Sequence, residues 1–108
     1  MGAAGWWRRI LGREAKPQPP PPREVDLPGA GRTRIAVSVD CLGASCPRPQ
    51  LLAMKVMSRM ADGEVVELRC DSAAAVEGFP ALAHTLLATH LTTVRDGHAW
   101  RVYLRKGL

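Results

Sequence analysis

The chain has 108 residues, is 46% hydrophobic and 23% charged, and carries a formal net charge of +5. This length accommodates one small core, and no apolar run approaches the roughly 18 residues that a membrane-spanning helix requires. Residues 1–34 hold seven basic and three acidic side chains, whereas residues 35–108 hold eight and seven, so direct nucleic-acid binding by the folded part is not expected.

Residues 1–34 are predicted to form a disordered N-terminal extension, and residues 35–108 the folded domain. The stretch "KPQPPPPREVDLPGAGR" is rich in proline and glycine, which predicts an extended linker without a core. Ahead of it, "GWWRRILGR" has two interpretations: a short segment that makes weak contact with a membrane or a docking partner, or a disordered tail. It lacks the features of a secretory signal.

Regular patterns begin at residue 35. Alternation in "IAVSVD" predicts a half-buried strand with Ile35, Val37 and Val39 on one face. Helix-forming residues from Pro47 to Ala61 predict the first helix, and "EVVELRC" at residues 64–70 predicts a second half-buried strand.

The last third of the chain predicts a helix and a hairpin. The apolar stripe of the helix is Phe79, Leu82, Ala83, Leu86 and Leu87. Because proline lacks a backbone N–H, this helix is expected to begin at Pro80. A strand near Leu91–Arg95, a turn at Asp96 and Gly97, and a strand over Ala99–Lys106 complete the pattern.

The element order β-α-β-α-β-β predicts an α/β, two-layer sandwich. A parallel crossover between the first two strands is right-handed, so both helices are expected on one face of a mixed four-stranded sheet. The other face would carry polar and charged side chains and would be open to water.

The three cysteines separate by their positions in these elements. Alternation places Cys41 and Cys70 on the apolar faces of their strands, where a thiol is a small packing group. Cys46 lies in a loop before Pro47, and proline at the first helical position predicts Cys46 as the N-cap. An odd number of cysteines also favours a cytoplasmic protein with reduced thiols over a secreted disulfide scaffold.

The helix start predicts a reactive sulfur at Cys46. Pro47 and Pro49 lack an N–H, which leaves the Arg48 amide as the prominent donor near the sulfur. This amide, the helix dipole and the Arg48 cation would favour the thiolate, the nucleophilic form. The alternatives are a cysteine that serves only as a weak cap, and a Cys41–Cys46 disulfide if Cys41 is not buried.

The stretch "DCLGASCPRP" resembles the signature of the TusA-like (SirA-like) sulfur-carrier family. The matching positions are Asp40, Gly43, Cys46, Pro47 and Pro49, and the resemblance spans about residues 35–107. Lys55 falls where the family often carries a basic residue. The resemblance implies the sandwich fold also found in the C-terminal domain of bacterial translation initiation factor 3.

The family implies a persulfide relay rather than a stand-alone enzyme, with Cys46 as the sulfur-carrying residue. Its partners would be a sulfur donor of the cysteine desulfurase or rhodanese type and a sulfur-acceptor protein, with no cofactor or metal. Transfer RNA thiolation, sulfur oxidation, cofactor biosynthesis and selenium handling stay open as pathways. The alternative is a non-catalytic redox-regulatory or protein-interaction module.

Two further groups of side chains bear on partners and metals. Arg48, Lys55 and Arg59 recur at nearly the same angle on the first helix, which fits either a solvated face or a docking strip for an acidic partner. The three histidines lack the close spacing of a zinc motif and are interpreted as surface residues.

Overall fold

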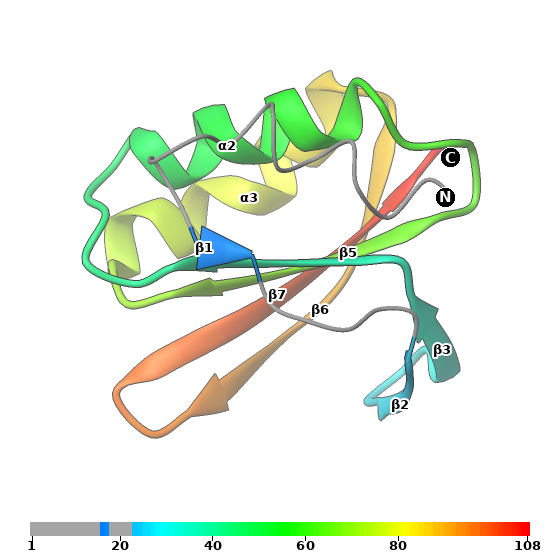
Figure 1. Cartoon of the computed structure of the whole chain (residues 1–108), viewed down its shortest axis with the longest axis horizontal. Helices are drawn as coiled ribbons and strands as arrows, with labels where there is room; N and C mark the ends of the chain where they lie inside the picture. Colours follow the sequence, from blue (N-terminus) through cyan, green and yellow to red (C-terminus); the bar gives the residue numbers. More distant parts are fainter. Residues whose placement is uncertain (1–15, 18–22) are drawn as a thin grey trace.

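The computed structural model describes residues 16–17 and 23–108 (Figure 1). Its main sheet has the strand order β1-β4-β5-β7-β6. These strands are β1 (Lys16–Pro17), β4 (Val37–Cys41), β5 (Val65–Cys70), β6 (Ala88–Asp96) and β7 (Ala99–Lys106). Strands β4 and β5 are parallel and the other pairs antiparallel, so β4 to β7 form the predicted mixed four-stranded sheet, with β1 added beside β4.

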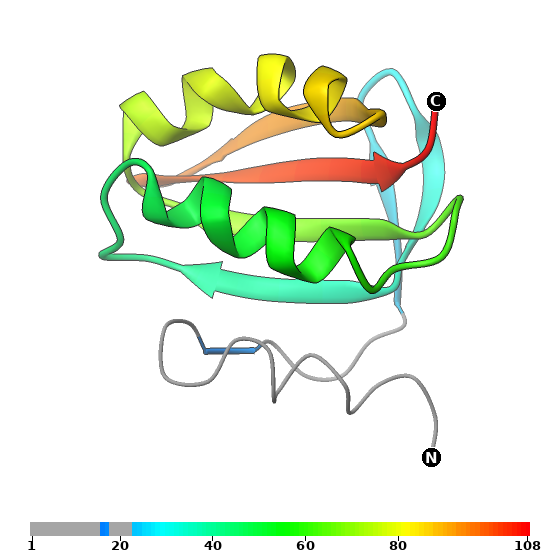
Figure 2. The same cartoon turned by 90° about the horizontal axis from the view of Figure 1, so that it is seen from above.

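Helices α2 (Arg48–Met57) and α3 (Ala73–Thr85) cover one face of this sheet (Figures 1 and 2). The architecture is therefore the predicted two-layer α/β sandwich. Its main core lies between the two layers and includes Val39, Leu52, Val56, Leu68, Phe79, Val102 and Leu104. Neither of the described helices is long and apolar enough to cross a membrane.

Helix α3 begins seven residues before the predicted start, and Pro80 lies inside it. Ser72 caps the helix, because its hydroxyl accepts the Ala75 N–H at 3.3 Å. Phe79 and Ala83 are buried, and Pro80 is on the exposed side. The cap and the buried face outweigh the roughly 3 kcal/mol that an internal proline costs, so the prediction of a start at Pro80 was wrong.

Helix α2 ends at Met57 rather than at the predicted Ala61. The amides of Arg59 and Met60 donate to carbonyls three residues earlier, at 3.0 and 3.2 Å. These tighter turns replace the α-helical bonding at the end of a helix. The chain then reaches β5 through the turn at Gly63, whose φ is 92°.

Residues 23–35, mostly within the predicted extension, form an antiparallel hairpin of β2 (Arg23–Leu27) and β3 (Gly31–Ile35). Composition predicted a linker without a core here, but Leu27 and Ile35 are buried against Val65 and Tyr103 of the main sheet. The prediction was wrong for this segment because the burial partners lie far along the chain. The Trp- and Arg-rich stretch at residues 5–13 lies outside the described residues, and its interpretations stay predictions.

The predicted strand over residues 35–40 is divided by this hairpin. Ile35 ends β3, and Val37 begins β4, so Ile35 does not share the helix-facing core with Val37 and Val39. The hairpin packs instead on the sheet face opposite the helices, at the edge shown in Figure 1.

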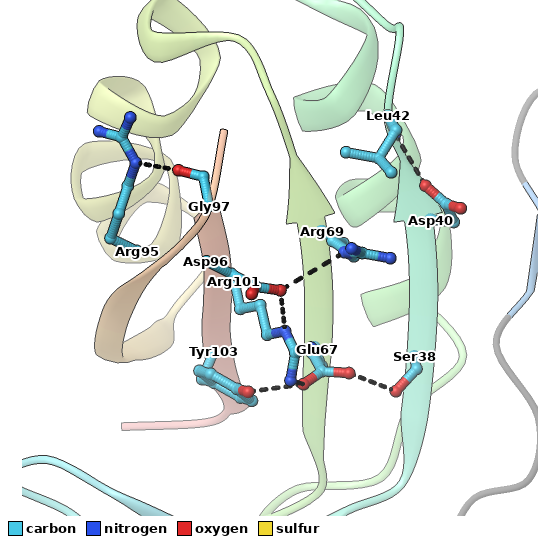
Figure 3. Close-up of polar contacts among 10 residues, drawn as sticks. All are labelled: Ser38, Asp40, Leu42, Glu67, Arg69, Arg95, Asp96, Gly97, Arg101 and Tyr103. Atoms are coloured by element: carbon cyan, nitrogen blue, oxygen red, sulfur yellow. Dashed lines mark hydrogen bonds and ion pairs between the residues drawn. The ribbon is translucent and has the colours of Figure 1, made fainter. Parts of the chain in front are cut away.

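The prediction that the face opposite the helices is open to water was therefore wrong in part. Ser38 and Glu67 on this face are only 1% and 5% exposed. The Glu67 carboxylate accepts hydrogen bonds from the Ser38 hydroxyl at 2.9 Å and from the Tyr103 hydroxyl (Figure 3). Arg101 lies beside it and donates to Asp96 at 2.9 Å. Because Ser38 and Glu67 are hydrogen-bonded, the face tolerates the burial of these two side chains.

Candidate functional site

Cys46 is the exposed thiol among three cysteines that form no disulfide with one another. It lies in the loop between β4 and α2, whereas Cys41 and Cys70 are 1% and 0% exposed. The assignment of Cys41 and Cys70 to the core by strand alternation is confirmed. Of the three thiols, Cys46 is therefore the one that a reactant from solution can reach.

Cys41 and Cys70 lie opposite each other on the parallel strands β4 and β5. A side-chain hydrogen bond with Cys70, together with burial, raises the pKa of the Cys41 thiol well above its ordinary range. A protonated, enclosed thiol is a poor nucleophile. These two cysteines are packing residues behind the site.

The loop that carries Cys46 is held by backbone hydrogen bonds to carboxylates. Asp40 accepts the Leu42 N–H at 2.9 Å (Figure 3), and Asp71 accepts the Gly43 N–H with both carboxylate oxygens, each at 3.1 Å. Gly43 has φ 83°, a conformation that side chains other than hydrogen disfavour. Asp40 and Gly43 therefore shape the loop, and Asp71 connects it to the β5–α3 turn.

The start of α2 differs from the predicted arrangement. Pro47, not Cys46, is the N-cap, and the helix begins at Arg48. The Arg48 amide, predicted to be the donor near the sulfur, instead donates to the Ser45 carbonyl at 2.8 Å and closes a turn around Cys46. The peptide bond between Cys46 and Pro47 is cis. Cys46 therefore precedes the cap by one residue, and no hydrogen bond from this amide reaches its sulfur.

Gln50 contacts the Cys46 sulfur and was not among the predicted site residues. The thiol donates to the Gln50 Oε1 at 3.6 Å, and the Gln50 Nε2 donates to the Ala75 carbonyl of α3 at 3.1 Å. A polar residue at the third position of a helix commonly reaches back toward the cap, so the sequence could have placed Gln50 near Cys46. No sequence pattern could have predicted the hydrogen bond from Gln50 to Ala75, 25 residues away.

A cleft of about 470 Å³ opens beside the sulfur, along the first turns of α2. Its lining residues are Ser45, Cys46, Pro47, Arg48, Leu51, Leu52, Met54 and Lys55. Leu51 and Met54, which are 52% and 40% exposed, form an apolar part of this lining. The site thus combines an exposed thiol, an apolar floor and two cations.

The predicted site residues are only partly brought together. Arg48 and Lys55 line the cleft with Cys46 and Pro47, and Pro49 is buried beneath it in the first turn of α2. Arg59 is exposed but follows the helix end, and it is not part of the cleft lining.

No metal centre is formed by the part of the chain that the structure describes, residues 16–17 and 23–108, since no three suitable side chains gather there. His84 and His98 are exposed. His90 is half-buried 2.7 Å from the Thr93 hydroxyl, and burial lowers the pKa of its imidazole.

The similarity of this chain to known proteins lies in the part that contains the Cys46 loop and the two helices. The chain matches the family model described as "Sulfurtransferase TusA" over residues 37–106, which includes the loop at Cys46 and both helices. Over 48 residues it is 40% identical to an Archaeoglobus fulgidus protein described as "Putative sulfur carrier protein". That stretch is 44% of this chain and 62% of the relative, so the chain spans less than two thirds of the relative's length.

Proposed function

This chain belongs to the sulfurtransferase TusA family, and from that premise we propose that it carries sulfur as a persulfide on Cys46. The observation that carries the proposal is the contrast among the three thiols. Cys46 is exposed at the mouth of a cleft, whereas Cys41 and Cys70 are enclosed in the core. A carrier needs one sulfur that two successive partners can reach.

The proposed reaction is two thiol–persulfide exchanges. The Cys46 thiolate attacks the terminal sulfur of a donor persulfide, a sulfur–sulfur bond forms on Cys46, and the donor's own sulfur–sulfur bond breaks. The donor cysteine leaves as a thiolate, so charge and oxidation state balance. An acceptor thiolate then attacks the terminal sulfur on Cys46 and releases Cys46 as a thiolate.

The surrounding residues support this chemistry by position and charge. The hydrogen bonds of Asp40 and of the Gly43 amide hold Cys46 just before the N-terminus of α2, where the helix dipole favours a negative group. Pro47 and Pro49 set the start of that helix. The Arg48 side chain in the cleft wall supplies a cation for the thiolate or the persulfide anion.

The cleft is the proposed docking site for the donor and acceptor proteins. Its apolar floor at Leu51 and Met54 fits a nonpolar side chain, and Arg48 and Lys55 fit acidic groups around it. Arg59 is exposed just beyond the end of α2. Together we call Arg48, Lys55 and Arg59 the basic strip. The donor would be of the cysteine desulfurase or rhodanese type, and the relay would operate in the cytoplasm, where thiols stay reduced.

The second candidate function is a redox-regulatory or interaction module, in which Cys46 forms mixed disulfides but carries no sulfur. An exposed thiol beside a docking cleft suits that function as well. The two candidates differ in one product. A carrier gains a sulfur atom that reductant removes, and a regulatory thiol gains a partner molecule or oxygen.

The test is intact-mass spectrometry of the full chain after incubation with a cysteine desulfurase and cysteine, or with a rhodanese and thiosulfate. We expect the mass of one added sulfur, lost on reduction, in the wild type and in the Cys41→Ala and Cys70→Ala variants. Cys46→Ala should gain none. A wild-type chain that gains no sulfur from either donor, or a Cys46→Ala variant that still gains it, contradicts the relay.

A further inference from the structure

Gln50 lies at the helix position whose side chain commonly accepts a hydrogen bond from the backbone of the N-cap residue. It is the third residue of α2, and a glutamine there commonly accepts the N–H of the N-cap residue. The N-cap here is Pro47, which has no N–H to donate. The Gln50 oxygen accepts from the Cys46 thiol instead, at 3.6 Å.

The orientation of the Gln50 carboxamide is determined by α3. The Ala75 carbonyl can only accept, so the amide nitrogen must face it, at 3.1 Å, and the oxygen must face the sulfur. Gly78 packs directly against this amide, since a carbon added at Gly78 would overlap the Gln50 Nε2. The carboxamide therefore cannot turn its nitrogen toward Cys46 without losing the bond to Ala75.

We propose that Gln50 is a positioning residue that restrains the Cys46 sulfur in its resting thiol form. An acceptor oxygen bonds a thiol but offers nothing to a thiolate or to a persulfide anion. The contact is therefore made in the resting protein and given up when the sulfur becomes the nucleophile. The inference rests on the proposed function of Cys46, because the restraint matters only if this sulfur reacts.

The test is the rate at which iodoacetamide alkylates Cys46 in the folded chain near neutral pH, followed by intact mass. Gln50→Leu keeps the size of the side chain and removes both hydrogen bonds, so we expect alkylation about two- to fivefold faster than in the wild type. Gln50→Glu loses the donor to the Ala75 carbonyl, but its carboxylate beside the sulfur accepts the thiol hydrogen and repels the thiolate. That variant should react more slowly than the wild type.

Gly78→Ala tests the same restraint without changing Gln50. The added methyl group should displace the carboxamide and accelerate alkylation in the same direction as Gln50→Leu. Thr85→Ala is the matched control, because it removes a side-chain hydrogen bond from the far end of α3, to the Ala81 carbonyl. We expect its alkylation rate to equal that of the wild type.

Opposite effects of Gln50→Leu and Gln50→Glu distinguish hydrogen bonding from a merely structural role, which would shift both rates in one direction. Wild-type rates in both Gln50→Leu and Gly78→Ala would overturn the proposal, as would a Gln50→Glu variant that reacts faster. If one variant fails to fold, as judged by thermal unfolding, the others still decide the question. Because no sulfur donor is present, failure of the relay itself would leave these rates unchanged.

Discussion

Asp71 accepts the backbone N–H of Gly43 with both carboxylate oxygens, each 3.1 Å from the nitrogen. The two residues are 28 positions apart, and their contact joins the loop of Cys46 to the turn before α3. Gln50 and Ala75 make a second connection between the same two parts of the chain. Cys46 is thus positioned by contacts with residues near the starts of both helices, as well as by its own loop.

Replacement of Asp71 by Ala should loosen the loop. We expect a loss of about 1–2 kcal/mol in the free energy of unfolding, since a hydrogen bond to a charged acceptor is lost at an exposed site. Sulfur loading on Cys46 should also slow. Urea denaturation and intact mass measure the two effects. Glu77→Ala removes the same charge from an exposed position on α3 and should change the stability by less than about 0.5 kcal/mol.

Gly43→Ala should lower stability by about 1 kcal/mol and also slow sulfur loading. The cost arises from the backbone, because φ is 83° and no atom lies within 4 Å of an added carbon. Gly29→Ala is a matched control: its φ is 80°, and its surroundings are equally empty. If both variants lose the same stability and only Gly43→Ala loads sulfur slowly, the slow loading is caused by the loop of Cys46. Normal sulfur loading in Gly43→Ala would contradict this role of the loop.

The three thiols should differ strongly in reactivity toward iodoacetamide. In the native chain we expect modification of Cys46 alone, with Cys41 and Cys70 at least about 1,000-fold slower, because they react only after unfolding. Peptide mapping by mass spectrometry after timed alkylation gives the rates. Denaturant should make all three reactive. Native modification of Cys41 at a rate near that of Cys46 would show that the core opens locally at β4.

Stability should fall in alkaline solution because of Tyr103. Burial, and then the hydrogen bond to Glu67, raise the pKa of Tyr103 to about 12. The ordinary value is about 10, so the unfolded chain loses this proton first, and unfolding becomes easier as the pH rises from about 10 to 12. The raised pKa of Cys41 acts in the same direction from about pH 8.5 upward.

Tyr103→Phe tests this pH dependence. At neutral pH it should cost about 1 kcal/mol, through loss of the hydrogen bond to Glu67. Urea midpoints measured between about pH 8 and pH 11 should then fall less steeply in the variant than in the wild type. Parallel curves for the two proteins would contradict a raised pKa of Tyr103.

Charge reversal on the basic strip should weaken partner docking. In Lys55→Glu and Arg59→Glu we expect the rate of sulfur loading at low donor concentration to fall by about tenfold, and the difference to shrink in high salt. Arg34→Glu makes the same charge change on the hairpin β2–β3 and serves as the control. If Arg34→Glu slows loading as much, net charge rather than the strip is responsible.

Much of the fold could be predicted from local patterns. Alternation placed Val39, Leu68 and Val102 in the core and identified Cys41 and Cys70 as buried. Two of the errors have local causes. Pro80 predicted a helix start that the Ser72 cap and the buried Phe79 outweigh. Cys46 was expected to cap α2, but the turn closed by the Arg48 amide moved the cap to Pro47.

By itself the sequence determined which faces are apolar, which cysteine lies outside the core, and where the first helix begins to within a residue. These properties depend on neighbours a few positions apart, whose side chains share a face by the geometry of strand or helix. Only the tertiary structure decided that Asp71 holds Gly43, that Gln50 bridges Cys46 to Ala75, and that Leu27 and Ile35 cover Tyr103. Those partners lie 25 or more residues apart in most cases, and packing of the layers brings them together.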